Sequence, residues 1–188
     1  HLDKIWMDGN LVPWDDAKVH VLTHTLHYGL GAFEGIRAYK RADGKSSVFR
    51  LREHIDRLFD SLKLCLMPCP FTREQMMQGC VDVLKANKLG EGYLRPIAWL
   101  GSEVLGISPR GAAVQMAIAA WPWPDYYGAD RMRGIRMGEA GWKRPSPETA
   151  PTAAKCTSMY PIGRRAKRRG EDEGYSDALK LSGRGAGA

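Results

Sequence analysis

An amphipathic helix in the first third of the chain is the feature that most constrains the fold. Apolar residues recur there at intervals of three and four, which places them on one face of a helix: Leu51, Ile55, Leu58, Leu62 and Cys65. The segment "MPCPF", residues 67–71, ends this helix because proline cannot continue it. A helix with one apolar stripe needs a second layer of structure to cover that stripe.

Two hairpin patterns precede this helix. Residues 5–12, "IWMDGNLV", predict two short strands around an Asp-Gly turn. A second hairpin is predicted over residues 35–51, from "GIRAYKR" across "ADGK" into "SSVFRL". These strands could form the layer that the helix needs.

Further helix and strand patterns follow. Thr72 begins a second helix, where Gln75 completes a capping box, and residues 87–90 end it. Residues 93–100 and 112–121 predict strands, and the second is apolar enough to be buried on both faces. The order of elements predicts an α/β fold of the α+β type, in which helices pack on one side of a mixed layer.

A segment rich in proline and glycine, residues 121–134, predicts a division of the chain. We expect an N-terminal α/β domain over residues 1–128, an interdomain linker over residues 129–134 and the incomplete start of a larger second domain over residues 135–188. The last of these is too short to bury a core of its own.

The net charge of +7 raises the question of nucleic acid binding. The densest basic run is "GRRAKRRGEDEG", residues 163–174, and its acidic residues follow the basic ones at once. The run has no interleaved aromatic residues and no recognition-helix pattern, so we predict a solvated helix face and no nucleic acid partner.

The sequence also predicts no metal site and no membrane partner. No apolar run approaches the roughly 18–20 residues that span a bilayer, and no signal pattern begins the chain, so we expect a soluble, cytoplasmic protein. The cysteines lack metal-ligand spacing and predict mostly buried thiols in a reducing compartment; they are Cys65, Cys69, Cys80 and Cys156.

Two segments contain residues suited to chemistry. "RPSPETAPTAAK", residues 144–155, ends in Lys155 after small and rigid residues that leave space for a flat ring. Such a lysine can form a Schiff base with an aldehyde, although most lysines are simply solvated. "HVLTHTLHYGLGAFEGIRAY", residues 20–39, contains three glycines among histidine and aromatic residues, which is typical of a binding loop or of a tight structural turn.

Five segments together resemble one family. "HVLTHTLHYGLGAFEGIRAY", "FRLREHIDRL", "YLRPIAWLG", "AAWPW" and "RPSPETAPTAAK" occur in the order found in branched-chain amino acid aminotransferases, which are pyridoxal phosphate enzymes of fold type IV. The resemblance runs from Ile5 to about Leu181. It implies a fold-type IV aminotransferase in which residues 135–188 begin the C-terminal, cofactor-binding domain. The implied reaction is the reversible, ping-pong transfer of an amino group between leucine, isoleucine or valine and 2-oxoglutarate.

The resemblance also implies roles for individual residues. Lys155 matches the lysine that holds pyridoxal 5'-phosphate as a Schiff base and moves the proton at the substrate α-carbon. Arg57 matches the arginine that binds the cofactor phosphate, and Tyr160 matches the tyrosine that hydrogen-bonds the phenolic oxygen of the ring. Taken alone, Arg57 fits a helix-surface arginine better than a phosphate-binding one, and Tyr160 fits a residue at the edge of a core.

A set of further positions matches the substrate pocket of that family, which accepts both a branched aliphatic and an acidic side chain. The positions are Tyr28, Phe33, Gly35, Tyr93, Arg95, Leu105, Ile107, Trp123 and Tyr126. Of these, Tyr28, Leu105 and Ile107 match residues that reach across a dimer interface. The implied partners are branched-chain amino acids, glutamate, 2-oxo acids and a second copy of the chain in a homodimer or higher homo-oligomer.

The chain departs from the family pattern in three ways. Family members continue well past the equivalent of residue 188, so we expect an incomplete chain that lacks the acidic partner of the pyridine nitrogen. "KCTSMYP" replaces the small residues that usually follow the lysine, and Pro161 is expected to disturb the start of the next helix. Gly163 and Gly170 lower the helix propensity of that segment.

Three alternatives remain open at this point. The chain could be another fold-type IV transaminase with a different amino donor. It could also be a catalytically inactive remnant that acts as a dimerisation or binding module. Binding of nucleic acid is the most distant alternative.

Overall fold

The computed structural model describes residues 2–124, 128 and 132–183. The chain divides into two compact units. The first comprises His1–Trp123 together with Ala154–Thr157, and the second comprises Pro124–Ala153 and Ser158–Ala188. The predicted linker at residues 129–134 is only partly within the described ranges and stays a prediction.

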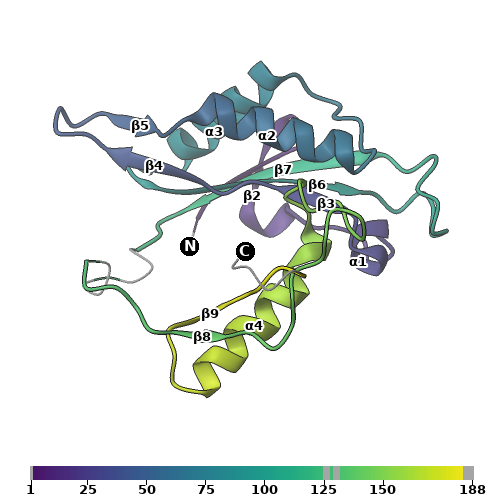
Figure 1. Cartoon of the computed structure of the whole chain (residues 1–188). Coiled ribbons are helices and arrows are strands. Elements are labelled where there is room, and N and C mark those ends of the chain that lie inside the picture. Colours follow the sequence, from purple (N-terminus) through teal and green to yellow (C-terminus); the bar gives the residue numbers. More distant parts are fainter. Residues whose placement is uncertain (1, 125–127, 129–131, 184–188) are drawn as a thin grey trace. The chain divides into compact units, whose positions relative to one another are not determined.

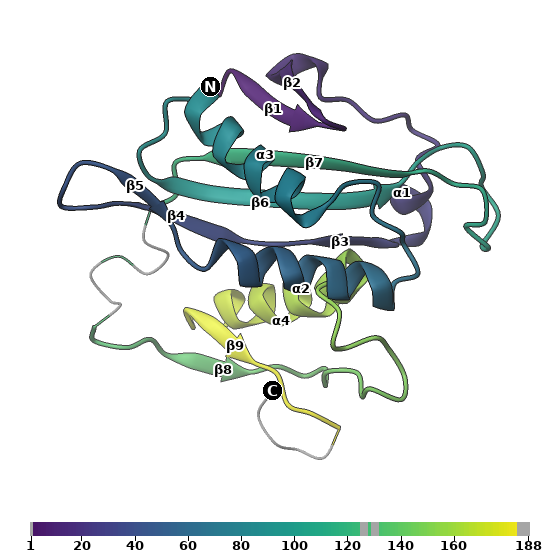
Figure 2. The same cartoon turned by 90° about the horizontal axis from the view of Figure 1, so that it is seen from above.

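Within its described residues, the first unit is built on a seven-stranded antiparallel sheet. The strands lie in the order β2-β1-β7-β6-β4-β5, and β3 also pairs with β6 (Figure 2). Their bounds are β1 Lys4–Met7, β2 Asn10–Pro13, β3 Gly31–Phe33, β4 Ile36–Lys40, β5 Ser46–Val48, β6 Gly92–Leu100 and β7 Val114–Trp121. Both predicted hairpins are confirmed, as β1–β2 and β4–β5.

Two long helices, α2 (Leu51–Leu64) and α3 (Arg73–Ala86), cover one face of this sheet (Figure 1). The predicted apolar stripe of α2 is confirmed, since Ile55, Leu58 and Leu62 are buried. The capping box of α3 forms as expected, with Thr72 and Gln75 each accepting a hydrogen bond from the other's backbone N–H. Two short helices complete the unit: the 3-10 helix η1 (Trp14–Asp16) and α1 (His24–Tyr28). The predicted mixed α/β class is confirmed.

The prediction for the last long strand was wrong in one respect. The burial of β7 alternates: Met116, Ile118 and Ala120 are buried, whereas the residues between them are only partly covered. The strand is rich in alanine, so its sequence is apolar on both faces although only one face enters the core. Composition therefore failed to distinguish a strand buried on one side from a strand buried on both.

The edge formed by β3 and β4 is interrupted at Glu34 and Gly35. Both strands pair with β6 in one continuous register, Phe33 opposite Ile97 and Ile36 opposite Leu94. Glu34 lies opposite Pro96 and donates its backbone N–H to the Pro96 carbonyl at 2.9 Å. Because proline has no N–H, the returning hydrogen bond of the ladder cannot form, and the strand is broken at this position.

The second unit contains α4 (Tyr160–Asp172), which follows the 3-10 helix η3 (Thr157–Met159), and a parallel pair of strands, β8 (Met137–Glu139) and β9 (Asp177–Leu179). Pro161 lies in the first turn of α4, where a missing N–H has no cost, so the expected disturbance of the helix start is not found. Gly170 is explained by close packing, since a Cβ there would lie 2.9 Å from the Asp177 carbonyl oxygen.

Only small side chains form the core cluster described in the second unit: Ala140, Ala166 and Ala178. The basic run of α4 is confirmed as a solvated face, because Arg164, Arg165, Arg168 and Arg169 are all exposed. No helix in the described ranges combines the length and the hydropathy that a membrane span requires.

The predicted buried thiols are confirmed for Cys65, Cys80 and Cys156, and Cys69 is half-buried. Burial raises the pKa of Cys80 to about 12. Burial, together with the neighbouring Cys156, raises the pKa of Cys65 to about 11. A thiol that stays protonated is a poor nucleophile and a poor metal ligand, so these side chains act as core residues.

Candidate active site

Lys155 lies on the edge of the sheet in the first unit. The backbone N–H of Phe33 donates to the Lys155 carbonyl at 3.1 Å, and Cys156 forms an antiparallel bridge with Ala32. The backbone N–H of Lys155 donates to Ser61 Oγ, on α2, at 3.0 Å. Residues 154–157 thus extend the sheet beside β3, and the lysine backbone is fixed from two sides.

An aromatic cage surrounds a second cation on the adjoining part of the sheet. The Arg95 guanidinium carbon lies 4.5 Å from the ring centroid of Phe33, 5.4 Å from that of Tyr93 and 5.9 Å from that of Trp121. The Lys155 amine lies 4.8 Å from the same Phe33 ring. Phe33, Tyr93, Arg95 and Lys155, which were predicted separately, are therefore brought together.

Not every hydrogen-bond donor of Arg95 has a partner within this cage. Its Nη2 donates to the Tyr93 hydroxyl at 3.2 Å, but its buried Nε finds no hydrogen-bond partner among the described residues. Buried donors in proteins are almost always paired, because an unpaired donor costs about 1–3 kcal/mol. The Nε of Arg95 is therefore an unusual buried donor within this cluster.

Trp123 and Gly35 complete this group of predicted residues. The Trp123 ring lies 5.2 Å from that of Tyr93, and its backbone carbonyl accepts a hydrogen bond from Arg37 Nη1 at 3.2 Å. A Cβ on Gly35 would lie 1.9 Å from the Tyr93 hydroxyl oxygen. Glycine at this position is thus what allows Tyr93 to reach across the broken strand.

We therefore expect Gly35→Ala to displace the Tyr93 ring and to break the hydrogen bond that Arg95 donates to its hydroxyl. Two tryptophan rings hold Tyr93, so the ring cannot move cheaply, and we expect a loss of about 1–3 kcal/mol in the free energy of unfolding. Chemical denaturation measures the loss of stability, and a crystal structure of the variant shows the position of the Tyr93 ring. Gly90→Ala is the matched control, because Gly90 is exposed, has no positive φ, and a Cβ there would meet only Ser46 Oγ, at 3.9 Å. A Tyr93 ring that keeps its position in Gly35→Ala would contradict the expected displacement.

Arg57 is held by a buried carboxylate that the sequence analysis missed. Arg57 donates from Nε and Nη2 to the two oxygens of Glu34, at 2.5 and 2.7 Å. His54 Nδ1 lies 2.9 Å from Glu34 Oε2. The Glu34 side chain is fully buried, whereas that of Arg57 is 53% exposed. The arginine is therefore anchored by the glutamate while its side chain stays partly exposed.

The charge of Glu34 is maintained by these two partners. Burial opposes the charge, but the hydrogen bonds from Arg57 and His54 outweigh burial and lower the pKa of Glu34. A carboxylate with a lowered pKa stabilises the fold above its unfolded pKa, and that contribution is lost as the pH falls through the folded pKa. Glu34 therefore remains ionised at neutral pH.

A signal for Glu34 was present in the sequence. Every second residue from position 32 to position 38 lies on the same face of the sheet, and all of them are buried: Ala32, Glu34, Ile36 and Ala38. A glutamate in the buried phase of such an alternation requires a cationic partner. Trp121, the third wall of the Arg95 cage, was also missed, although it lies in the quoted motif "AAWPW".

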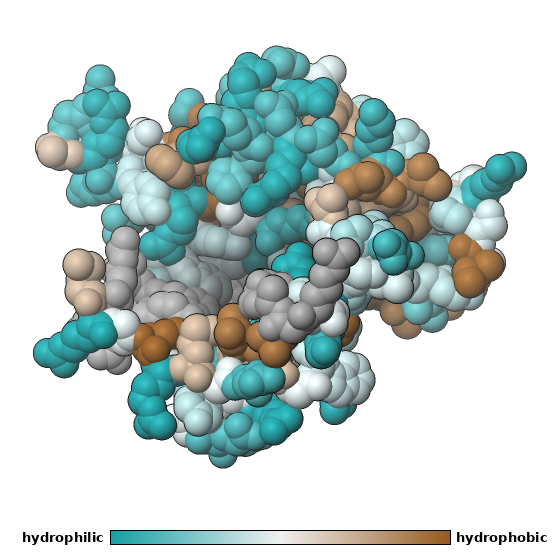
Figure 3. Space-filling model, in the orientation of Figure 1, coloured by the Kyte–Doolittle hydropathy of each residue, from teal (hydrophilic) through white to brown (hydrophobic). Residues whose placement is uncertain are grey.

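Three predicted residues lie at another place in the first unit. The Tyr28 hydroxyl donates to the Leu105 carbonyl at 2.9 Å, and the Tyr28, Leu105 and Ile107 side chains are exposed. Val21 and Leu26, before and within α1, are exposed as well. Figure 3 shows hydrophobic surface, in brown, on the right side of the molecule. Tyr160 belongs to the second unit, at the start of α4, and Tyr126 lies outside the described residues.

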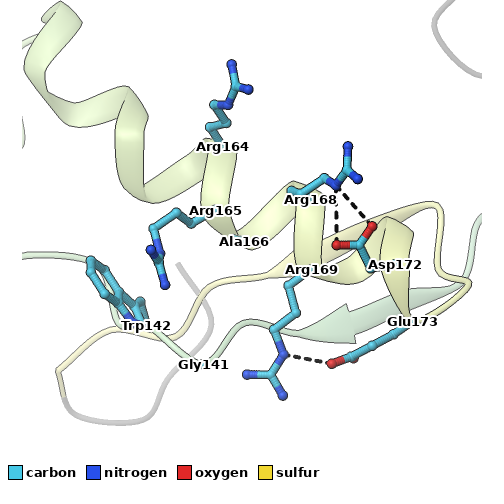
Figure 4. Close-up of a pocket in the computed structure, with 9 residues that line it drawn as sticks. All are labelled: Gly141, Trp142, Arg164, Arg165, Ala166, Arg168, Arg169, Asp172 and Glu173. Carbon is cyan, nitrogen blue, oxygen red and sulfur yellow. Dashed lines mark hydrogen bonds and ion pairs between the residues drawn. The ribbon is translucent and has the colours of Figure 1, made fainter.

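A cavity of about 440 Å³ in the second unit contains none of the predicted site residues (Figure 4). Arg165 points toward Trp142, with its guanidinium carbon 4.3 Å from a Trp142 ring centroid. Arg169 points to the same side and pairs with Glu173 at 2.7 Å. Since these exposed arginines already have partners, the cavity gives no specific indication of a ligand.

The chain is similar in sequence to known aminotransferases. Residues 31–186 match the family model described as amino-transferase class IV. The branched-chain-amino-acid aminotransferase of Escherichia coli strain K12 is 42% identical over 187 residues, which is 96% of this chain and 60% of that protein. The chain therefore spans about three fifths of the length of that curated relative.

Solved structures give the same result. The crystal structure of the E. coli branched-chain amino acid aminotransferase has a TM-score of 0.96 and 38% identity, covering 100% of this chain and 62% of that one. The T.th. branched-chain amino acid aminotransferase with pyridoxamine 5'-phosphate has a TM-score of 0.94 and 36% identity, covering 100% and 61%. Other crystals of the T.th. enzyme contain N-(5'-phosphopyridoxyl)-L-glutamate or 4-methylvaleric acid. By its sequence and by its fold, the chain belongs to the class IV aminotransferase family.

Proposed function

We propose that this chain functions as a branched-chain amino acid aminotransferase that uses pyridoxal 5'-phosphate. In the proposed reaction an amino group moves reversibly between leucine, isoleucine or valine and 2-oxoglutarate by a ping-pong mechanism. The main support within the structure is the cluster around Phe33. There the Lys155 amine and the caged Arg95 guanidinium contact the same ring.

The residues present fit the proposed cofactor. Pyridoxal phosphate, when bound, supplies an electron sink for the bond broken at the substrate α-carbon. Arg57 presents a planar, permanently charged fork that suits a phosphate dianion. Lys155 would hold the cofactor through its amine and then move the proton at the α-carbon, and Tyr160 would bind the phenolic oxygen of the ring. The T.th. enzyme was solved with pyridoxamine 5'-phosphate, which supports the choice of cofactor.

The Arg95 cage fits the two kinds of substrate side chain. Its aromatic walls, with Phe33 and Tyr93 contributed by adjacent strands, offer apolar contacts to a branched aliphatic group. The Arg95 guanidinium would bind the distal carboxylate of glutamate or 2-oxoglutarate. The two T.th. complexes support this dual use, because one contains a glutamate adduct and the other a branched aliphatic acid.

We further propose that a second copy of the chain covers the surface around Tyr28, Leu105 and Ile107. These side chains are 47%, 42% and 83% exposed, and an apolar cluster of this kind indicates an interaction site. In the proposed homodimer this edge of each copy would contribute to its partner's substrate pocket.

Reductive trapping of the cofactor tests the proposal. The purified chain is incubated with pyridoxal phosphate, reduced with borohydride and mapped by peptide mass spectrometry, and transamination of 2-oxoglutarate is then assayed with leucine. We expect one adduct per chain at Lys155 and activity with leucine. Activity only with another amino donor would favour a different class IV transaminase. Scattered labelling of many lysines would contradict the proposed function and favour an inactive binding module.

A further inference from the structure

Glu34 is a buried anion at the point where the two parts of the candidate site meet. Its backbone follows Phe33, whose N–H holds the Lys155 carbonyl at 3.1 Å. Its own backbone N–H is fixed to Pro96 at 2.9 Å. Its side chain lies on the opposite face of the sheet from Phe33, because successive side chains of a strand alternate, and there it meets α2. One residue therefore connects the lysine segment to the helix that contains Arg57.

The contact with Arg57 fixes the orientation of the guanidinium. Both oxygens of Glu34 are used, one by Nε and one by Nη2, and such a two-point pairing sets the plane of the fork as well as its position. An arginine on a helix surface otherwise samples many rotamers, at an entropy of about 2 kcal/mol. Glu34 therefore orders this side chain before any anion binds to it, which lowers the entropy cost of binding.

His54 supports the carboxylate from the same helix. It lies one turn before Arg57, at the i−3 position, and its Nδ1 lies 2.9 Å from Glu34 Oε2. Since an ionised carboxylate only accepts hydrogen bonds, Nδ1 is the donor in this contact. The neutral imidazole is sufficient for this role.

We propose that Glu34 is the positioning residue for the arginine that binds the cofactor phosphate, and that His54 supports Glu34 in this role. Glu34 acts only through Arg57 and touches neither the cofactor nor the substrate. The inference rests on the proposed function, because it concerns the arginine that would bind the phosphate.

Cofactor affinity in matched variants tests the inference. In Glu34→Gln the shape of the side chain is kept, but the charge and one acceptor are lost. We expect the Kd for pyridoxal phosphate to rise about tenfold, as for the loss of a charge-assisted hydrogen bond. The Kd for pyridoxal, which has no phosphate, should change by less than about twofold, since no phosphate contact is involved. Glu53→Gln is the matched control. Glu53 is an exposed glutamate of α2 that pairs with Arg50, so its replacement should change neither Kd.

A double-mutant cycle shows whether Glu34 acts through Arg57. Arg57→Ala alone should weaken pyridoxal phosphate binding, and adding Glu34→Gln should weaken it no further. His54→Phe removes the supporting donor at a position that is only partly buried. It should raise the Kd for pyridoxal phosphate about threefold, the size of one weak hydrogen bond, and it tests the same inference if Glu34→Gln does not fold.

The Kd values test the role of Glu34, and the adduct at Lys155 tests the proposed function. Unchanged binding of pyridoxal phosphate in the folded variants, or equal losses for pyridoxal and its phosphate, would overturn the role of Glu34 and leave the proposed function intact. A further loss when Glu34→Gln is added to Arg57→Ala would do the same. If the parent chain forms no adduct at Lys155, the proposed function fails, and the inference fails with it.

Discussion

Lys155→Ala is expected to abolish the borohydride-reducible attachment of pyridoxal phosphate to the chain. The alanine keeps the backbone hydrogen bonds to Phe33 and Ser61, because these use only the main chain of residue 155. The segment should therefore stay on the edge of β3 while the amine is lost. Removing a positioned base costs about 10²–10⁴-fold in rate, so we expect transamination to fall at least that far.

The measurement compares the reduced peptide maps of the parent chain and the variant. Lys85→Ala, on the exposed side of α3, is the matched control and should keep the adduct at Lys155. Circular dichroism establishes that the Lys155→Ala variant is folded. An adduct of unchanged stoichiometry in a folded Lys155→Ala chain would show that the cofactor is held by another lysine, and the proposed role of Lys155 would be wrong.

The largest expected loss of stability follows from truncating the stripe of α2. Leu58 is 0% exposed and lies in the core between α2 and the sheet. Leu58→Ala removes three carbon atoms there and leaves a cavity that a β-sheet on one side and a helix on the other cannot easily close. We expect the free energy of unfolding of the first unit to fall by about 2–5 kcal/mol.

Urea denaturation followed by tryptophan fluorescence measures this loss. Leu66→Ala is the control, because Leu66 follows the same helix but is 85% exposed. Its effect should stay within about 0.5 kcal/mol. Equal midpoints for the two variants would contradict the placement of Leu58 in the core.

The parts of the fold that the sequence predicted well are those determined by local patterns. The stripe of α2 repeats at helical spacing, the Thr72–Gln75 pair is a local capping signal, and the Asp8–Gly9 turn joins two strands that are adjacent in sequence. Each of these depends on residues only a few positions apart. Local patterns could not predict the order of the strands in the sheet or the break opposite Pro96, because both depend on pairing between strands that are distant in sequence.

The candidate site shows the same limit. The family resemblance identified Arg57 and Lys155, but it did not indicate that a buried glutamate holds Arg57 or that Lys155 is hydrogen-bonded to α2. Glu34 and Arg57 are 23 residues apart, and Lys155 and Ser61 are 94 apart. Contacts of this range are set by tertiary packing, so propensity and periodicity contain little information about them.

The position of residues 154–157 in the first unit has a consequence for biosynthesis. The chain leaves the ribosome from its N-terminus, so residues 1–123 emerge before the segment that pairs with β3. Thirty residues of the second unit, 124–153, are synthesised between them. Until Lys155 has emerged, the outer edge of β3 and the Ser61 hydroxyl have no partner from this segment. The nascent first unit can therefore assemble most of its core early, but it acquires the lysine only after translation has passed well into the second unit.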